Sequence, residues 1–291
     1  MKKLLAAVLC TAMVASVTAC GAKSGDGGTA TTAAAAGTTA AAGTTAQAEA
    51  ATEAKDDSES AKEFYQEVLK KNEELTSIDM SLNMDMNMDA GTEKMTMNMK
   101  MDVQADGLNE DDMKYYANMS TEADGQSVDM VMFYTDGYYY MDTMGQKVKC
   151  VMDASAMTEQ GMDITSTDLT PEYIKEISVE EQGDNKIIKI TGDAENMMPY
   201  VEGILANSGS ASSLEGMDVT INDISSEYVV NKDGYYTSMK LVMDIDMEAQ
   251  GQKASMVINM DSTVNNPGQP VEVTLPSTDG FTEVDASLLE G

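Results

Sequence analysis

Apolar side chains occupy every second position over much of this chain. The alternation is clearest from Met80 to Met88, where serine, asparagine and aspartate stand between the apolar residues, and again from Met95 to Val103. A period of two is typical of a β-strand with one buried face, because successive side chains of a strand point to opposite sides. Pairing Met88 with Met95 keeps both methionine rows on one face. The two runs therefore predict an antiparallel hairpin.

Three turn signals extend this hairpin without changing its buried face. Asp124-Gly125, Asp136-Gly137 and Met144-Gly145 each predict a tight turn between neighbouring strands. The sequence therefore predicts an antiparallel meander of about six strands from Met80 to Met152, polar outside and rich in methionine inside. The pairs expected on the inner face are Met119 with Met130, Ala117 with Met132, Tyr115 with Tyr134, Tyr134 with Tyr139, Met132 with Met141, Met141 with Val148, and Tyr139 with Cys150.

A second series of strands is predicted in the last third of the chain. The turns Asp233-Gly234 and Gln250-Gly251 connect strands whose apolar residues again share one face. A bulge is expected near Asp223, where the phase of the apolar residues changes, and a final strand is expected over residues 271–275. The pairs expected here, with those of a preceding hairpin, are Ile177 with Ile190, Val179 with Ile188, Tyr228 with Met239, Met247 with Ala254, Ile245 with Met256, and Met243 with Ile258.

Helical patterns lie before and between the two series of strands. Ser60 and Glu63 form a capping box at the start of a helix with one apolar stripe. Shorter helices are predicted near residues 153–160 and after Thr170, and a bent or split helix is predicted over 193–207, which a proline interrupts. The first of these helices, with its one apolar stripe, needs a surface to pack against.

The N-terminal residues predict export and a lipid anchor. Residues 1–19 combine two lysines with an apolar run that is too short to span a membrane, which is typical of a signal peptide. Val17-Thr18-Ala19-Cys20 resembles the lipobox of bacterial lipoproteins, which implies cleavage before Cys20 and acylation of its thiol. The alternative is an ordinary secretory signal that contains a cysteine. Residues 21–59, mostly alanine, threonine and glycine, predict a disordered tether, so the protein is expected on the extracytoplasmic face of the cell membrane.

The rest of the chain is predicted to be one α+β domain over residues 60–285, with a C-terminal tail over 286–291. Its order of helix, meander, helices and meander, behind a lipobox and a low-complexity tether and ending in Val-Glu-Val-Thr-Leu-Pro, resembles the LolA-like and LppX/LprG-type lipoproteins. This resemblance implies a curved antiparallel sheet, or half-barrel, with helices packed on its concave face. It also implies that the space between them binds acyl chains, and it offers no catalytic residues.

The strongly negative charge of the chain limits the kinds of partner that it can bind. The formal net charge of −32 becomes −34 when Lys2 and Lys3 leave with the signal peptide. Such an acidic surface repels nucleic acid and anionic lipid head groups. We therefore expect no nucleic-acid partner, and we expect a monomer that contacts the membrane through its N-terminal lipid.

The residue types present also narrow the chemistry. The chain has no histidine, so Ser or Cys triads of the usual kind and imidazole metal sites are excluded. An aspartic pair or a Ser/Lys dyad remains an alternative. However, no Asp-Thr-Gly or Asp-Ser-Gly motif supports the pair, and no Ser-x-x-Lys at a plausible helix start supports the dyad. With Cys10 in the signal peptide and Cys20 acylated, Cys150 has no partner and is expected to be a small buried hydrophobe. No enzymatic activity, cofactor or metal site is expected.

The 27 methionines are the most unusual feature of the composition. Methionine is flexible and polarizable, so it suits the lining of an adaptable pocket, and its thioether also binds Cu(I). Because the methionines lie in sheet register over many strands, a lining or core role is favoured over copper binding. Whether the interior is an open cavity or a filled core stays undecided. The candidate ligand-lining residues are Met84, Met86, Met97, Met99, Met130, Met132, Met141, Met243, Ile245, Met256 and Ile258.

Two functional hypotheses follow. The first is a tethered carrier or chaperone that binds a hydrophobic, acyl-chain ligand on the methionine-rich face. The second is a ligand-free interaction or sensor domain at the cell envelope with a filled interior. For the second, an outward aromatic patch of Phe133, Tyr138 and Tyr140 is a candidate partner site, although aromatic residues on strands also serve packing alone.

Overall fold

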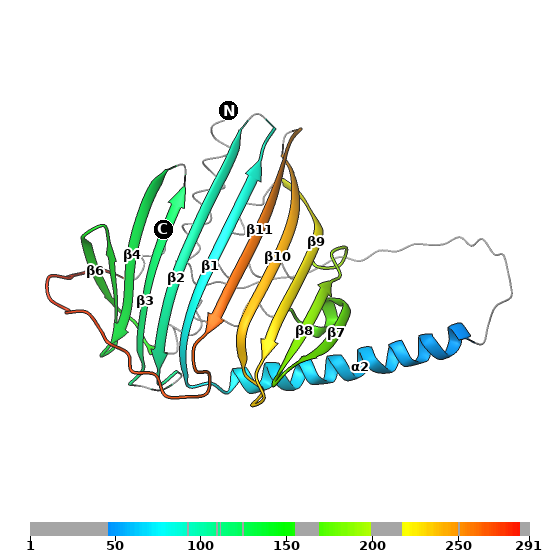
Figure 1. Cartoon of the computed structure of the whole chain (residues 1–291). Coiled ribbons are helices and arrows are strands. Elements are labelled where there is room, and N and C mark those ends of the chain that lie inside the picture. Colours follow the sequence, from blue (N-terminus) through cyan, green and yellow to red (C-terminus); the bar gives the residue numbers. More distant parts are fainter. Residues whose placement is uncertain are drawn as a thin grey trace, which may run out of the picture.

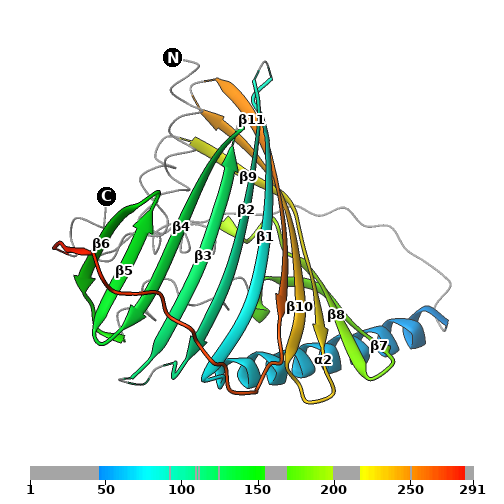
Figure 2. The same cartoon turned by 60° about the vertical axis from the view of Figure 1, so that its left-hand side comes forward.

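The computed structural model of the chain describes residues 46–154, 169–198 and 217–285, apart from 92, 109, 111, 124 and 250. The described strands are β1 (Ser77–Asp89), β2 (Lys94–Asp106), β3 (Lys114–Ala123), β4 (Gln126–Thr135), β5 (Tyr138–Thr143), β6 (Gln146–Val151), β7 (Ile174–Gln182), β8 (Asn185–Gly192), β9 (Met217–Val230), β10 (Tyr236–Ala249), β11 (Gln252–Val264) and β12 (Thr282–Glu283). These strands form one sheet in the order β12-β6-β5-β4-β3-β2-β1-β11-β10-β9-β8-β7. Figures 1 and 2 show that the sheet is open and curved.

The predicted register of the first meander is confirmed. Met88 pairs with Met95 across the first hairpin, and all seven inner pairs expected from the next three turns are present. Gly125, Gly137 and Gly145 have positive φ angles, as tight turns between right-twisted strands require. Local turn chemistry and the alternation of apolar residues therefore agree along this whole region.

The second series of strands also follows the prediction. All six expected pairs occur, and the pairing of β9 with β10 shifts between Asp244 and Ile245, which face Asp223 and Ile221. This shift is the predicted bulge near Asp223. It brings Ile221 and Ile224 to the buried side although they are three residues apart.

The two meanders join through β1 and β11. Met84 pairs with Met260, and Met86 pairs with Ile258, across a separation of more than a hundred residues. No turn connects these strands, so no local signal in the sequence predicted that they are neighbours. This pairing makes one continuous sheet from the two series of strands.

A long helix, α2 (Ala46–Glu73), lies across one end of β7–β10 (Figures 1 and 2). Its residues Ala61, Tyr65 and Val68 are buried in a cluster with β8, β9 and β10. The Tyr65 hydroxyl donates a hydrogen bond to the Leu169 carbonyl oxygen at 3.1 Å. This helix is the one α-helix whose bounds lie within the described residues, where the short 3-10 helix η2 (Pro171–Tyr173) also occurs. The expectation of several helices packed on the concave face is not confirmed.

The start of α2 differs from the prediction. The capping box at Ser60 lies inside the helix, which begins at Ala46, so residues 46–59 are not the disordered tether that was expected. Alanine and glutamate are strong helix formers, and a serine within a helical run does not by itself end it. The helices expected near 153–160 and over 193–207 lie mostly outside the described residues.

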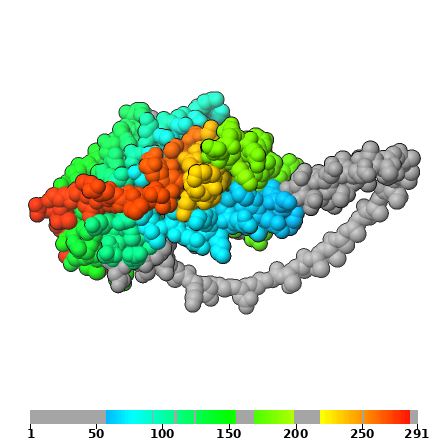
Figure 3. Space-filling view, turned by 60° about the horizontal axis from the view of Figure 1, so that its bottom comes forward, coloured from blue at the N-terminus to red at the C-terminus, as the bar shows by residue number. Residues whose placement is uncertain are grey.

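The predicted final strand over residues 271–275 is wrong. These residues belong to an extended segment that leaves β11 and crosses the lower ends of the strands toward β6 (Figures 1 and 3). Val271, Val273 and Leu275 are half-buried, whereas Glu272 and Thr274 are exposed. Alternation therefore arises here from contact with the protein on one side, without the backbone pairing of a strand. The pairing comes later, where β12 adds in parallel to the edge strand β6.

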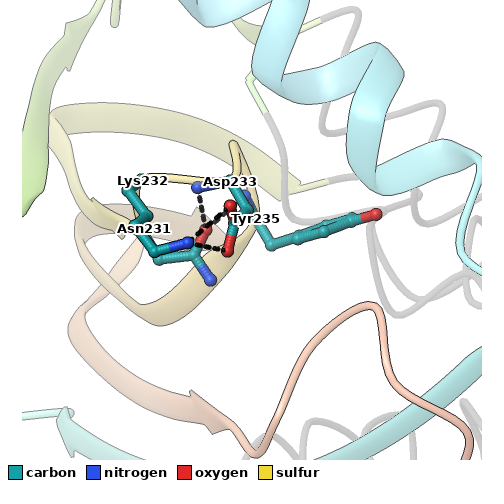
Figure 4. A network of polar contacts seen from close by, with 4 residues as sticks. All are labelled: Asn231, Lys232, Asp233 and Tyr235. Atoms are coloured by element: carbon teal, nitrogen blue, oxygen red, sulfur yellow. Dashed lines mark hydrogen bonds and ion pairs between the residues drawn. The ribbon is translucent and has the colours of Figure 1, made fainter.

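The turn between β9 and β10 packs beside α2. Figure 4 shows that the Asn231 side-chain oxygen accepts hydrogen bonds from the backbone N–H groups of Asp233, at 2.9 Å, and of Tyr235, at 3.0 Å. Lys232 forms an ion pair with Asp233 at 2.8 Å. The ammonium of Lys71, in α2, lies 4.9 Å from the centre of the Tyr235 ring. The acidic residue of this turn, Asp233, is thus paired with a lysine. The described residues contain no cluster of three potential metal ligands.

Candidate ligand-binding face

Most buried side chains of the sheet lie on one face, which we call the inner face, and the buried apolar residues of this face form three clusters. The first unites α2 with β7–β10 and includes Tyr65, Tyr228 and Met239. The second lies on β2–β6 around Met132. The third lies at the far ends of β10 and β11 around Met256. The inner face is therefore not one evenly packed core within the described residues.

The predicted lining residues divide into two groups by exposure. The first group, buried at 3–9% exposure, is Met97, Met132, Ile245 and Met256. The second group is half-buried. Its members are Met84, Met86, Met99, Met130, Met141, Met243 and Ile258.

The sheet brings most of the predicted lining residues together across four adjacent strands. Met84 pairs with Met99, and Ile258 pairs with Met86 on one side and Met243 on the other. Cross-strand partners on one face have Cβ atoms about 5 Å apart, so these side chains are direct neighbours. The half-buried residues therefore form a continuous apolar surface over β2, β1, β11 and β10.

The remaining predicted residues lie apart from this surface. Met130, Met132 and Met141 belong to β4 and β5 and pack in or against the second cluster. The strand β3 separates them from β2, with Ala117 directly opposite Met132. Only part of the predicted lining is thus contiguous.

Several inner-face residues were left out of the predicted ligand lining. Leu82, Leu241 and Met260 lie between the predicted lining residues in the register. The alternation in the sequence was enough to predict their face, because each lies an even number of positions from the methionines of its strand and so points to the same side of the sheet. Ser226 and Ser262 also point to the inner face, where the apolar pattern of the sequence does not predict a polar side chain.

Ionisable groups on the inner face are held neutral by burial. Desolvation raises the pKa of the Tyr115 and Tyr139 hydroxyls far above the usual value for tyrosine. Burial also raises the pKa of the Cys150 thiol, whose side chain is fully buried. The expectation that Cys150 is a buried hydrophobe agrees with both observations.

The outward aromatic patch is occupied by the chain itself, so it is not the free partner surface that was expected. Phe133 and Tyr140 stack at 4.5 Å between ring centroids, and Phe281 meets both rings edge-on at 5.5 and 5.1 Å. Phe133 is 0% and Tyr140 5% exposed. An ion pair of 3.6 Å between Lys149 and Glu283 also holds the C-terminal segment that carries Phe281 against the sheet.

Among the described residues, no helix is both long enough and apolar enough to cross a bilayer.

Several solved structures are similar to this chain at low identity. LprF from Mycobacterium bovis is 13% identical, with a TM-score of 0.43, over 76% of this chain and 99% of that chain. A DUF1329 family protein from Desulfovibrio piger is 11% identical, with a TM-score of 0.25, over 74% and 95%. A LolA superfamily protein from Nitrosomonas europaea is 10% identical, with a TM-score of 0.21, over 69% and 93%.

Both classes that the sequence resembles, LppX/LprG-type and LolA-like, are therefore represented among these structures. TM-scores of this size carry no information on function. No curated protein matches the chain. Residues 60–278, which include most of the sheet and the second half of α2, match the family described as "Family of unknown function (DUF6612)", and the chain belongs to that family.

Proposed function

We propose that this protein is a membrane-anchored, extracytoplasmic lipoprotein that binds or carries a hydrophobic, acyl-chain ligand on its inner face. The observation that carries the proposal is the continuous surface of half-buried apolar side chains around Met84, Met99 and Ile258. A filled core normally buries such residues almost completely. Residues that stay partly exposed on a concave, apolar surface are available to a ligand.

The choice of methionine supports a ligand whose shape varies. Leucine, isoleucine and valine define packing sharply, whereas methionine has three rotatable bonds and adapts to its neighbours. Met84, Met86 and Met99 lie together at the centre of the sheet. A flexible lining at this place fits acyl chains of different length and curvature.

Binding through this surface depends on buried apolar area. The lysines of the described strands lie on the outer face or near strand ends, and the chain is strongly acidic. Burial of apolar surface stabilises a complex by about 25 cal/mol per Å² and is nearly independent of salt. Ligand affinity should therefore change little between low and high ionic strength.

The anchor and the absence of catalysis complete the proposal. Acylation of Cys20 would hold the domain at the membrane, where acyl ligands are found. The proposed role is the binding of a ligand without its chemical conversion.

The test is direct measurement of bound lipid and of uptake. The purified protein should release lipid into organic solvent, as detected by mass spectrometry, and should bind a fluorescent fatty acid with micromolar or better affinity. Met99→Trp should reduce uptake more than it reduces the free energy of unfolding, because a larger side chain fills the proposed surface. Lys100→Trp, on the opposite face of the same strand, is the matched control. If no lipid is found and no probe binds, the carrier role is refuted and the interaction or sensor domain takes its place.

A further inference from the structure

Two buried hydroxyl groups on the inner face have no hydrogen-bond partner. Ser226 is 6% and Ser262 4% exposed, and the Oγ atom of each is covered yet unpaired in the structure. Buried polar groups in proteins are nearly always hydrogen-bonded, because an unpaired group loses its bonds to water without compensation. Two such groups on one face therefore call for a functional reason.

The register places both serines in rows that lead to the half-buried methionines. The first row runs across the sheet as Ser226, Leu241, Met260, Met84 and Met99. Each residue in it is the direct cross-strand partner of the next, so their side chains lie side by side on the inner face.

The adjacent row contains the second serine. It runs as Tyr228, Met239, Ser262, Leu82 and Met101. The two rows are neighbours along the strands, and the two serines flank β10 from opposite sides. Neither row contains a lysine or a carboxylate.

The serines mark the border between packed and partly exposed regions. Tyr228 and Met239 belong to the buried cluster with α2, whereas Leu82 and Met84 are half-buried and lie outside the three clusters of described residues. An incoming group must displace a side chain to reach either hydroxyl. Leu241 and Leu82, the direct cross-strand neighbours of the serines, are half-buried.

We propose that Ser226 and Ser262 bind the neutral polar group of an acyl ligand whose chain lies along Met84 and Met99. The inference rests on the proposed function and defines its ligand class more closely. A serine hydroxyl donates to an ester or amide carbonyl oxygen, or exchanges hydrogen bonds with a ligand hydroxyl. A carboxylate is disfavoured, because neither row has a cation to pair with a buried negative charge.

The experiment compares three probes with oleoyl or octadecyl chains on the full mature chain. Monooleoylglycerol carries a neutral ester and hydroxyls, oleate carries a carboxylate, and 1-octadecene has no polar group. Each competes against a fluorescent long-chain probe without a carboxylate. The variants are Ser226→Ala and Ser262→Ala, and the control is Ser225→Ala, whose side chain lies on the opposite face of β9.

Monooleoylglycerol should bind the wild-type protein more tightly than oleate, and its affinity should fall roughly 3- to 10-fold in each inner-face variant. The affinity for 1-octadecene should stay the same, and the unliganded variants should be at least as stable as the wild type, because each loses an unpaired buried hydroxyl. Unchanged monooleoylglycerol affinity would overturn the inference and leave the carrier role intact. Lower stability of both unliganded variants would overturn it too, since the hydroxyls would then have a structural partner. If the wild type binds none of the three probes, the proposed function itself fails.

Discussion

Asn72 in α2 and Tyr236 in β10 are joined by a buried hydrogen bond across 164 residues of sequence. The Asn72 side-chain oxygen accepts from the Tyr236 backbone N–H at 3.1 Å. The same amide donates to the carbonyl oxygens of Val68, at 2.7 Å, and Gly234, at 3.3 Å. One side chain thus satisfies backbone groups of both the helix end and the β9–β10 turn, which ties α2 to the sheet.

Replacing Asn72 should loosen that attachment. Asn72→Ala leaves the Tyr236 N–H without its acceptor, and an unsatisfied buried donor costs about 1–3 kcal/mol. The free energy of unfolding, measured in urea, should fall by that amount. Glu73→Ala, at an exposed position of the same helix turn, should change it by less than about 0.5 kcal/mol. Equal effects at the two positions would show that Asn72 does not anchor the helix.

A change between an apolar and a charged side chain should alter the free energy of unfolding far more on the inner face of the sheet than on the outer face. Met132 is 3% exposed within the second cluster, so Met132→Asp buries a charge that has no cation nearby and should destabilise by roughly 3 kcal/mol or more. Asp85 is exposed on the outer face, and Asp85→Met should change stability by less than about 1 kcal/mol. Chemical denaturation of both variants tests the assignment of faces, which similar losses would contradict.

Phe281 should hold the C-terminal segment on the outer face. Phe281→Ala removes both edge-on ring contacts with Phe133 and Tyr140, and aromatic pairs contribute about 0.5–1.5 kcal/mol each beyond burial. Hydrogen exchange should therefore become faster at the Val284 N–H, which bonds to the Lys149 carbonyl oxygen at 2.9 Å. Thr282→Ala, at an exposed site on the same segment, is the control. Unchanged exchange in the Phe281 variant would mean that the segment is held by other contacts.

Asp89 should titrate at lower pH than an ordinary aspartate. A hydrogen bond from Lys94, another from the Gly91 backbone N–H and the charge of Lys94 hold the pKa of its carboxyl below the usual value for aspartate. Because the pKa of Asp89 is lower in the folded protein than in the unfolded chain, the ionised carboxylate stabilises the fold at pH values above the pKa of the unfolded chain. This stabilisation is lost as the pH falls through the pKa of the folded protein. The pair is solvent-exposed, so its effect on stability is small. NMR titration should show the shift largely removed in Lys94→Ala, and an unchanged midpoint would refute the role of Lys94.

The lipid anchor can be tested separately from the domain. Cys20→Ala removes the residue predicted to carry the acyl chains, so the protein should move from the membrane fraction to the soluble fraction after cell lysis. Immunoblots of both fractions measure the change. If the variant stays in membranes that only detergent extracts, a lipid on Cys20 is not the attachment.

Much of the sheet could be predicted because its information is local. Alternation assigns each side chain to a face, and a tight turn such as Asp136-Gly137 passes that assignment to the next strand. For the same reason the bulge at Asp223 was visible as a change of phase. The methionine surface of the candidate site followed from these rules, residue by residue, as far as Met84, Met99 and Ile258.

The alternation of side chains along a strand shows which face a residue lies on, but it does not show what covers that face. Phe133 and Tyr140 point outward as predicted, yet Phe281 buries them, because a segment nearly 150 residues later in the chain returns to the edge strand β6. The alternation of Val271 and Val273 suggested a strand for a similar reason, since one-sided contact produces the same pattern as pairing.

The sequence by itself therefore determined the register of each hairpin and the polarity of the two faces, both of which depend on neighbours in the chain. The tertiary structure alone decided that β1 pairs with β11, that Asn72 ties α2 to the β9–β10 turn, and that Ser226 and Ser262 are buried without partners. These relationships join residues far apart in sequence, and their free energy depends on which groups meet and exclude water after folding, which no local pattern records.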